Sequence, residues 1–318
     1  MAIAKTLFIC IILTLGSMSF TSATNDMVLE PIENMIKKIK NISNNPLDAV
    51  QKGEEQDYLN CLEEEENRKT DCCYDQGKKK KVSTLETILL EKTITKIGAL
   101  LALGFGQAGS EIIAQNMKNN DGGEIDPLIA GKKVMAVYGF CDIRNFTDST
   151  EVLEEEVMIF VNEIAEIVHG ITTDHLGSAN KNIGDAFLLV WKFDESMCIT
   201  DEETGDIKLK ENDHAVTQMV DLALIAFIKI QKQIHKSYKL DKYRKNPILQ
   251  KRLDKPTEKY QVKLGFGLHV GWSIEGAIGS SFKIDASYLS SHVNMSSSLE
   301  ERTKEYGTNL ILRYNILL

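Results

Sequence analysis

The chain has 318 residues, of which 43% are hydrophobic and 26% are charged, so it can form one sizeable core with additional segments. Its formal net charge of −9 argues against nucleic-acid binding, because a nucleic-acid-binding surface must be basic enough to neutralise phosphates. An acidic chain can still bind a nucleotide, since a bound metal ion supplies positive charge locally.

The N-terminus contains one basic residue, Lys5, followed by the apolar run Leu7–Leu15. This pattern fits a cleaved signal peptide, in which small residues around Ser22 would mark the cleavage site. It also fits a transmembrane anchor, although the run is short of the roughly 20 residues that a helix needs to span a bilayer. We predict a transmembrane anchor or a signal peptide at residues 1–23.

Residues 24–50 contain a predicted amphipathic helix, because apolar residues recur there at spacings of three and four. Pro31 lies near its start, and Asn45-Pro46 is expected to end it. Around Pro31 the segment resembles the HAMP-like linkers that follow a membrane helix in signalling enzymes. We therefore expect a HAMP-like juxtamembrane helix here.

Two further segments precede the main domain. Residues 51–82 are dense in charge, with an acidic run at Glu63–Glu66 and a basic run at Lys78–Lys81, and are predicted to form a flexible, solvated insert. Residues 83–130 carry an apolar stripe at helical spacing, which usually indicates core packing or helix pairing. We expect signalling or dimer helices there.

A compact domain is predicted from residue 131 onward. Strand and helix patterns alternate along it, which is typical of an α+β sandwich. Residues 239–259, rich in lysine and aspartate, are expected to form an exposed loop, and Ile274–Ile278 another strand or loop. The other expected elements are strands at Val134–Cys141 and Gln261–Val270, helices at Val152–Val168, 213–236 and Met295–Tyr306, and a hairpin at Asn180–Trp191.

Two carboxylates carry the strongest chemical signal. Asp142 follows an apolar run in the stretch Phe140–Thr147, and Asp185 lies at the predicted hairpin turn in the stretch Ala179–Phe187. Each alone could be an ordinary turn residue. If the fold brings them together, they can hold a pair of divalent ions against a polyphosphate.

Five motifs, in order along the chain, resemble the catalytic domain of class III nucleotide cyclases, the adenylyl and guanylyl cyclases. The resemblance covers residues 131 to about 310 and implies a ferredoxin-like α+β sandwich with helices on a mixed sheet. In this chain we expect the sandwich at residues 131–318, preceded by a helical linker and an N-terminal membrane helix. The motifs are Phe140–Thr147, Lys181–Asp185, Gly267–Gly271, Gly276–Gly279 and Val293-Asn294.

The resemblance also implies a reaction. The 3′-hydroxyl of a nucleoside triphosphate attacks its own α-phosphate and pyrophosphate leaves, with two Mg²⁺ or Mn²⁺ ions per site. Asp142 and Asp185 correspond to the two metal-binding aspartates, and the backbone carbonyl of Ile143 corresponds to a further ligand. Phe146 and Thr147, in the same motif as Asp142, are expected to contact the substrate.

Two positions bear on the choice of base. Lys181 stands where adenylyl cyclases carry lysine and guanylyl cyclases usually carry glutamate; a lysine can donate to adenine N1 but cannot accept from guanine N1–H. Ser287 stands where adenylyl cyclases have aspartate, threonine or serine and guanylyl cyclases usually have cysteine. Both positions favour ATP, with a guanylyl cyclase as an alternative. Without the resemblance, Lys181 would be an exposed strand lysine and Ser287 a loop hydroxyl.

Two features depart from the family pattern. Asn294 corresponds to the asparagine that orients the ribose, but the arginine expected one helical turn later is Ser298. Arg302 lies a further turn along the same face and is the candidate to replace it. The sequence also ends soon after the strand-like Leu310–Leu312, before the hairpin that carries a phosphate-binding lysine in the family. A truncated chain, or an impaired homologue acting as a nucleotide-binding or regulatory partner, remains the alternative to an active enzyme.

Topology and partners follow from the expected substrate. ATP is cytosolic, so we expect residues 24–318 in the cytoplasm, tethered to a membrane by an uncleaved N-terminal helix and acting in intracellular signalling. Cyclase active sites form between two catalytic domains, one supplying the aspartates and the other the lysine and asparagine. This chain carries both sets, so the resemblance implies a homodimer, or a heterodimer with another cyclase domain.

Overall fold

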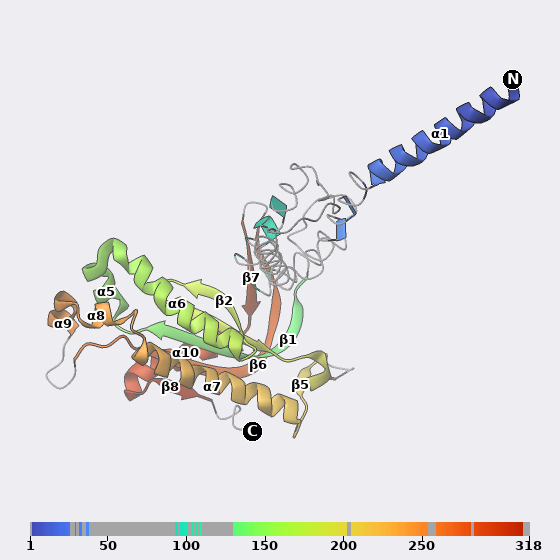
Figure 1. Cartoon of the computed structure of the whole chain (residues 1–318). Helices are drawn as coiled ribbons and strands as arrows, with labels where there is room; N and C mark the ends of the chain where they lie inside the picture. Colours follow the sequence, from blue (N-terminus) through green and yellow to red (C-terminus); the bar gives the residue numbers. More distant parts are fainter. Residues whose placement is uncertain are drawn as a thin grey trace. The chain divides into compact units, whose positions relative to one another are not determined.

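The computed structural model describes residues 2–25, 130–201, 205–253, 259–280 and 283–313, together with isolated positions between residues 29 and 109. These residues belong to two units, and Figure 1 colours their described elements along the sequence. The first unit comprises Met1–Gly104 and Ile113–Ile125, and the second comprises Phe105–Ile112 and Asp126–Leu318.

The first unit contains the long helix α1 (Ala2–Thr24). Its stretch Lys5–Thr24 is long and apolar enough to cross a membrane, and none of it is buried. A signal sequence has the same properties, so both expectations for residues 1–23 stand. The segments expected between residues 24 and 130 lie almost wholly outside the described residues.

The second unit is built on a mixed sheet and a small hairpin. The sheet strands are β1 (Lys132–Ile143), β2 (Ser178–Ile183), β3 (Ala186–Lys192), β6 (Leu264–Ser280), β7 (Lys283–Leu289) and β8 (Leu310–Leu312), and the hairpin strands are β4 (Cys198–Thr200) and β5 (Ile207–Leu209). The sheet order is β2-β3-β1-β6-β7, and β8 pairs with an earlier part of β6 than β7 does. Neighbouring strands are antiparallel except β6 and β8, which are parallel.

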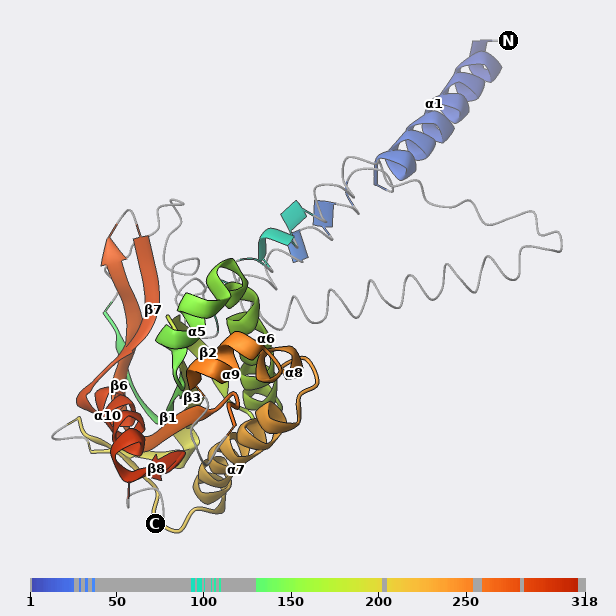
Figure 2. The same ribbon diagram turned by 90° about the vertical axis from the view of Figure 1, so that its left-hand side faces the viewer.

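Helices cover both faces of this sheet. They are α5 (Phe146–Leu153), α6 (Val157–Asp174), α7 (His214–Lys236), α8 (Asp241–Arg244), α9 (Pro247–Leu253) and α10 (Ser291–Tyr306), with 3-10 turns at Glu154–Glu156 and Glu195–Met197. Figure 1 shows α6 and α7 side by side along one face. Figure 2 shows α10 on the opposite side of the sheet from α7.

The main core lies between the sheet and helices α6 and α7. Alternate residues of β1, β3 and β6 reach it, because successive strand side chains point to opposite faces. The ring of Phe227 in α7 packs against Trp191 of β3 at a centroid distance of 5.7 Å and against Phe266 of β6 at 5.0 Å. Gly139 of β1 lies under Phe227, where any Cβ would clash. Burial of each ring contributes roughly 1.5–3 kcal/mol relative to exposure.

Helix α10 packs closely on the other face of the sheet, over glycines of β6. A Cβ at Gly267 would clash with the backbone oxygen of Ser296, and one at Gly271 would clash with the ring of His292. The motif Gly267–Gly271 therefore serves as a seat for α10, because only glycine lets the helix approach the strand this closely.

Most expected elements are present, with shifted boundaries, and the α+β class with helices on a mixed sheet is confirmed. The helix expected at Val152–Val168 is divided, because the chain turns at Glu154, whose φ is 47°, between α5 and α6. Ile274–Ile278, expected to be a separate strand or loop, is part of the continuous strand β6.

Residues 239–259 are not wholly the exposed loop that their composition predicts, because the described part contains α8 and α9. Leu240, Tyr243 and Leu249 are buried. Tyr243 packs edge-on against Phe160 of α6 at a centroid distance of 4.7 Å. The prediction was wrong because three apolar anchors suffice to dock a segment that is otherwise charged.

Candidate active site

Asp142 and Asp185 are brought together where β1 ends and the turn between β2 and β3 closes. Asp142 lies opposite Ala186, the first residue of β3. The backbone N–H of Ile143 donates to the carbonyl oxygen of Asp185 at 3.2 Å, which fixes the strand end against the turn. Gly184, with a φ of 64°, adopts the left-handed conformation of the turn without strain. The two predicted carboxylates therefore lie together.

The electrostatics of this pair favour a cation. Burial, followed by the charge of Asp142 and a hydrogen bond between the two carboxyl groups, raises the pKa of Asp185 to about 6. Two carboxylates this close either share a proton or bind a cation. Two carboxylates and the carbonyl of Ile143 are oxygen ligands of the kind that Mg²⁺ and Mn²⁺ prefer. In the described part of the chain no three His, Cys, Asp or Glu side chains could hold a metal together, so phosphate and water oxygens would complete the coordination.

Two basic side chains approach the pair. Nζ of Lys304, on α10, donates to Oδ2 of Asp142 at 3.0 Å. Nη1 of Arg144 lies 2.8 Å from Oε1 of the buried Glu300, and its Nη2 donates to Thr303. Burial raises the pKa of Glu300 and the charge of Asp142 adds to the effect, while Arg144 opposes it. The site is thus a compact cluster of alternating charges at the end of the sheet.

Three members of this cluster escaped prediction from the sequence. Arg144 stands inside the motif Phe140–Thr147, but it offers no metal-ligand chemistry of its own. Glu300 and Lys304 are four residues apart and so share one face of α10. That spacing is the signal that could have placed them together, although it does not name Asp142 as their neighbour.

Asn294, Ser298 and Arg302 form an exposed stripe along α10, which we call the α10 stripe. They repeat about once per helical turn, as predicted. The buried side of the helix includes Ser296 and Thr303. The α10 stripe therefore points away from the sheet that carries the aspartates.

Lys181 and Ser287, the two positions expected to select the base, differ in accessibility. Nζ of Lys181, on β2, lies 3.9 Å from Oδ2 of Asp285 on β7. Ser287 is only 9% exposed, whereas the side chain of Asp285 is 49% exposed. The accessible hydrogen-bond acceptor beside Lys181 is therefore Asp285, which the sequence had not singled out.

Phe146 and Thr147 begin α5, directly after the end of β1. Asn145, with a φ of 57°, precedes them as the N-cap. Phe146 is partly buried and packs against the main core, whereas Thr147 is exposed. Of the two predicted substrate contacts, Thr147 is thus the better placed to meet a ligand.

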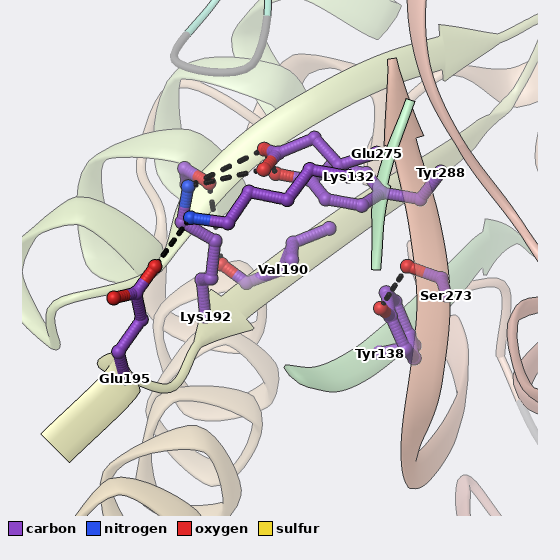
Figure 3. Close-up of polar contacts among 9 residues, drawn as sticks. Lys132, Tyr138, Val190, Lys192, Glu195, Ser273, Glu275 and Tyr288 are labelled. Carbon is purple, nitrogen blue, oxygen red and sulfur yellow. Dashed lines mark hydrogen bonds and ion pairs between the residues drawn. The ribbon is translucent and has the colours of Figure 1, made fainter. Parts of the chain in front are cut away.

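A polar network on the sheet face opposite α6 and α7 joins β3, β6 and β7 (Figure 3). Glu275, 5% exposed, accepts hydrogen bonds from Tyr288 at 2.6 Å and from Nζ of Lys192 at 3.2 Å. Nearby, Tyr138 and Ser273 share a hydrogen bond. A buried carboxylate is costly unless it is paired. The network therefore anchors β7, the strand that faces Lys181, to the centre of the sheet.

Comparison with known proteins identifies the family. Residues 132–309 match the model for the adenylate and guanylate cyclase catalytic domain. The match covers more than half of the chain, and the chain belongs to this family. A second family, described as the RasGEFs all helical domain, matches residues 1–118.

Similar proteins include adenylate cyclases. An adenylate cyclase from Anabaena cylindrica is 26% identical over 179 residues, which are 56% of this chain and 29% of that protein. Two structures of a bacterial light-regulated adenylyl cyclase align with a TM-score of 0.51, at 24% and 23% identity. These alignments cover 74% and 73% of this chain and 58% and 56% of those chains. The likeness confirms the cyclase fold, and this chain spans less than a third of its curated relative.

Proposed function

We propose that this chain is an adenylate cyclase that converts ATP to 3′,5′-cyclic AMP and pyrophosphate with two Mg²⁺ or Mn²⁺ ions. The observation that carries the proposal is the pair of Asp142 and Asp185, adjacent at the sheet end, with a pKa of about 6 for Asp185. A divalent cation bound between the two carboxylates would offset both the burial and the neighbouring charge that raise the pKa of Asp185. The adenylate cyclases among the similar proteins support the same activity.

The end of β1 and the β2–β3 turn would bind the metal ions. Asp142, Asp185 and the carbonyl of Ile143 would hold the ions. When bound, such ions lower the pKa of the attacking 3′-hydroxyl and neutralise the leaving pyrophosphate. Thr147, exposed at the start of α5, would donate to a phosphate oxygen, where the first N–H groups of the helix also point.

Residues of β2 and β7 would bind the adenine base of the nucleotide. Lys181 would donate to adenine N1, which is an acceptor. The amino group on C6 of adenine is a donor, and the exposed carboxylate of Asp285 beside Lys181 can accept from it. Ser287, which is largely buried, would contribute at most its hydroxyl at the edge of the base.

The α10 stripe favours a site shared by two chains. Asn294 would orient the ribose. Arg302 is the basic residue on the same face of α10 that could replace the arginine missing at Ser298. Because the stripe points away from its own sheet, a second cyclase domain would present it to the aspartates. We therefore infer a homodimer, or a heterodimer with another cyclase domain.

The N-terminal helix supports a membrane location. Helix α1 is long and apolar enough to serve as an anchor. ATP is a cytosolic substrate, so the catalytic domain would lie on the cytoplasmic side, where cyclic AMP acts as an intracellular signal.

Ser298 favours a second candidate function. The loss of one donor to the developing charge typically costs about a hundred- to a thousand-fold in rate. A chain with serine at this position could therefore bind metal and nucleotide while regulating an active partner.

Product formation by the full-length protein in detergent tests the proposal. With Mn-ATP and Mn-GTP supplied in parallel, we expect cyclic AMP as the main product and its loss in Asp142→Asn. Asp174→Asn removes an exposed carboxylate of α6 and should leave the activity unchanged. Wild-type protein that binds ATP but forms no cyclic nucleotide would refute the enzyme and favour the regulatory role.

A further inference from the structure

Lys304 occupies the carboxylate that a metal ion would use. Its Nζ lies 3.0 Å from Oδ2 of Asp142, which is the distance of a charge-assisted hydrogen bond. The side chain of Asp142 is 14% exposed, whereas that of Lys304 is 55% exposed. The lysine therefore reaches the site from its solvent side and can leave it without disturbing the core.

The other cation of the cluster, Arg144, pairs with a different carboxylate. Arg144 is 15% exposed and lies 2.8 Å from Glu300, with a second contact to Thr303. Glu300 is 5% exposed and depends on this partner, because an unpaired carboxylate is costly to bury. Lys304 is thus the exchangeable cation of the cluster, and Arg144 is the fixed one.

The seat of α10 sets the position of the lysine. A Cβ at Gly265 of β6 would clash with both Arg144 and Glu300, so the glycine is what admits this ion pair beneath the helix. Lys304 follows Glu300 by one helical turn, which places the start of its side chain on the same side of α10. The packing that holds Glu300 against the sheet therefore also brings Lys304 to Asp142.

An ammonium group and a divalent ion compete at this position. Asp142, Asp185 and Glu300 carry three formal negative charges when ionised, against two positive charges on Arg144 and Lys304. A metal ion arriving beside both cations meets their repulsion, which is stronger in a partly buried site than in water. Departure of the ammonium removes the part of that repulsion due to Lys304 and frees Oδ2 of Asp142.

We propose that Lys304 is an internal competitor for divalent metal at Asp142. This inference rests on the proposed function, since it takes Asp142 as a metal ligand. In the metal-free chain the ammonium holds the carboxylate in place. Metal binding displaces it, and the lysine side chain turns out to solvent. Lys304 thereby lowers the metal affinity of the empty site.

Mn²⁺ binding to the full-length protein without nucleotide, followed by electron paramagnetic resonance of free Mn²⁺, tests this role. Lys304→Met should tighten Mn²⁺ binding by about two- to fivefold, the value of a partly exposed ion pair. Lys304→Arg retains the charge and should stay within about twofold of wild type. Lys245→Met removes an exposed lysine that pairs with Asp241 at 3.9 Å, and it should leave the affinity unchanged.

The same titration identifies the site. The gain in Lys304→Met should disappear when Asp142→Asn is added. Unchanged or weaker binding in Lys304→Met, or a gain that persists without the Asp142 carboxylate, would overturn the proposal. Failure here is separable from failure of the proposed function: a wild-type chain that forms cyclic AMP while Lys304→Met binds Mn²⁺ no more tightly refutes only the role of the lysine.

Discussion

The two regions expected to meet in catalysis are held in different ways. Asp142 and Asp185 are fixed by strand pairing, by a backbone hydrogen bond and by a partly buried cluster of charges. The α10 stripe of Asn294, Ser298 and Arg302 is exposed. A substitution on an exposed helix face usually costs little stability, whereas a buried charge cluster tolerates few changes. The pair of aspartates can therefore keep its geometry while residues of the exposed α10 stripe change.

The largest expected effect is on the metal-binding region. Asp185→Asn should lower the rate of cyclic nucleotide formation by about a thousand-fold, since the metal contribution to the barrier is several kcal/mol and each 1.36 kcal/mol is tenfold. Steady-state rates with Mn-ATP measure it, and thermal unfolding checks that the fold is retained. A loss below about tenfold would mean that this region does not carry the chemistry.

The next largest effect is expected on the α10 stripe. Ser298→Arg restores a cation on the α10 stripe and should raise kcat by about a hundred-fold, because it adds a donor to charge that develops in the transition state. Mn²⁺ affinity should not change, since the stripe points away from the sheet. The test is to measure kcat and KM for ATP in both proteins. An unchanged kcat would show that the missing cation at position 298 does not limit the rate.

Base selection should respond more modestly. Lys181→Glu replaces a donor by an acceptor, so the ratio of kcat/KM for ATP to that for GTP should fall by about ten- to a hundred-fold. Lys283→Glu makes the same change at a more exposed lysine that also approaches Asp285, at 3.5 Å, and serves as the control. Equal shifts in the two variants would indicate a general charge effect rather than recognition by Lys181.

The last expected effect concerns stability rather than activity: a pH dependence at the seat of α10. His269 is fully buried, and its Nε2 lies 2.9 Å from Nδ1 of His292. Burial, followed by the charges of His292 and Arg313, lowers the pKa of His269 to about 4 from an ordinary value of 6.5. As pH falls below 6.5 the unfolded chain binds a proton before the folded chain does. The stability contribution is therefore full above pH 6.5, and on the order of 3 kcal/mol is lost as pH falls towards 4.

Urea unfolding at pH 7.5 and pH 4.5 measures this loss. His269→Gln should flatten the difference between the two conditions, whereas His214→Gln, at the exposed start of α7, should preserve it. An undiminished pH dependence in His269→Gln would place its origin in other groups.

Strand ends, turns and helical spacing depend on short stretches of the chain, so the sequence could predict them. The strand that ends at Asp142 and the hairpin that turns at Asp185 were predictable, because an apolar run that breaks off marks a strand end. The spacing of the α10 stripe followed from helical geometry alone. These patterns place each carboxylate at a strand end or a turn, and the pairing of β1 with β3 then brings the two together.

The remaining features depend on contacts between distant parts of the chain. Lys304 and Asp142 are 162 positions apart, and they meet only because β6 carries glycines where α10 packs. The accessibility of Asp285, and the burial of Ser287 beside it, depend on how β7 lies against its neighbours. A sequence pattern gives residue types and periods, but it does not give such tertiary distances.

The most direct test is complementation between two inactive variants, because it asks whether the two regions meet across a dimer. Asp142→Asn removes a proposed metal ligand, and Asn294→Ala removes the proposed ribose contact of the α10 stripe. Mixed and allowed to exchange subunits, they should recover about a quarter of the wild-type cyclic AMP formation, because half of the dimers are mixed and each mixed dimer has one intact site. A mixture that exchanges subunits and stays as inactive as either variant alone would contradict a shared site.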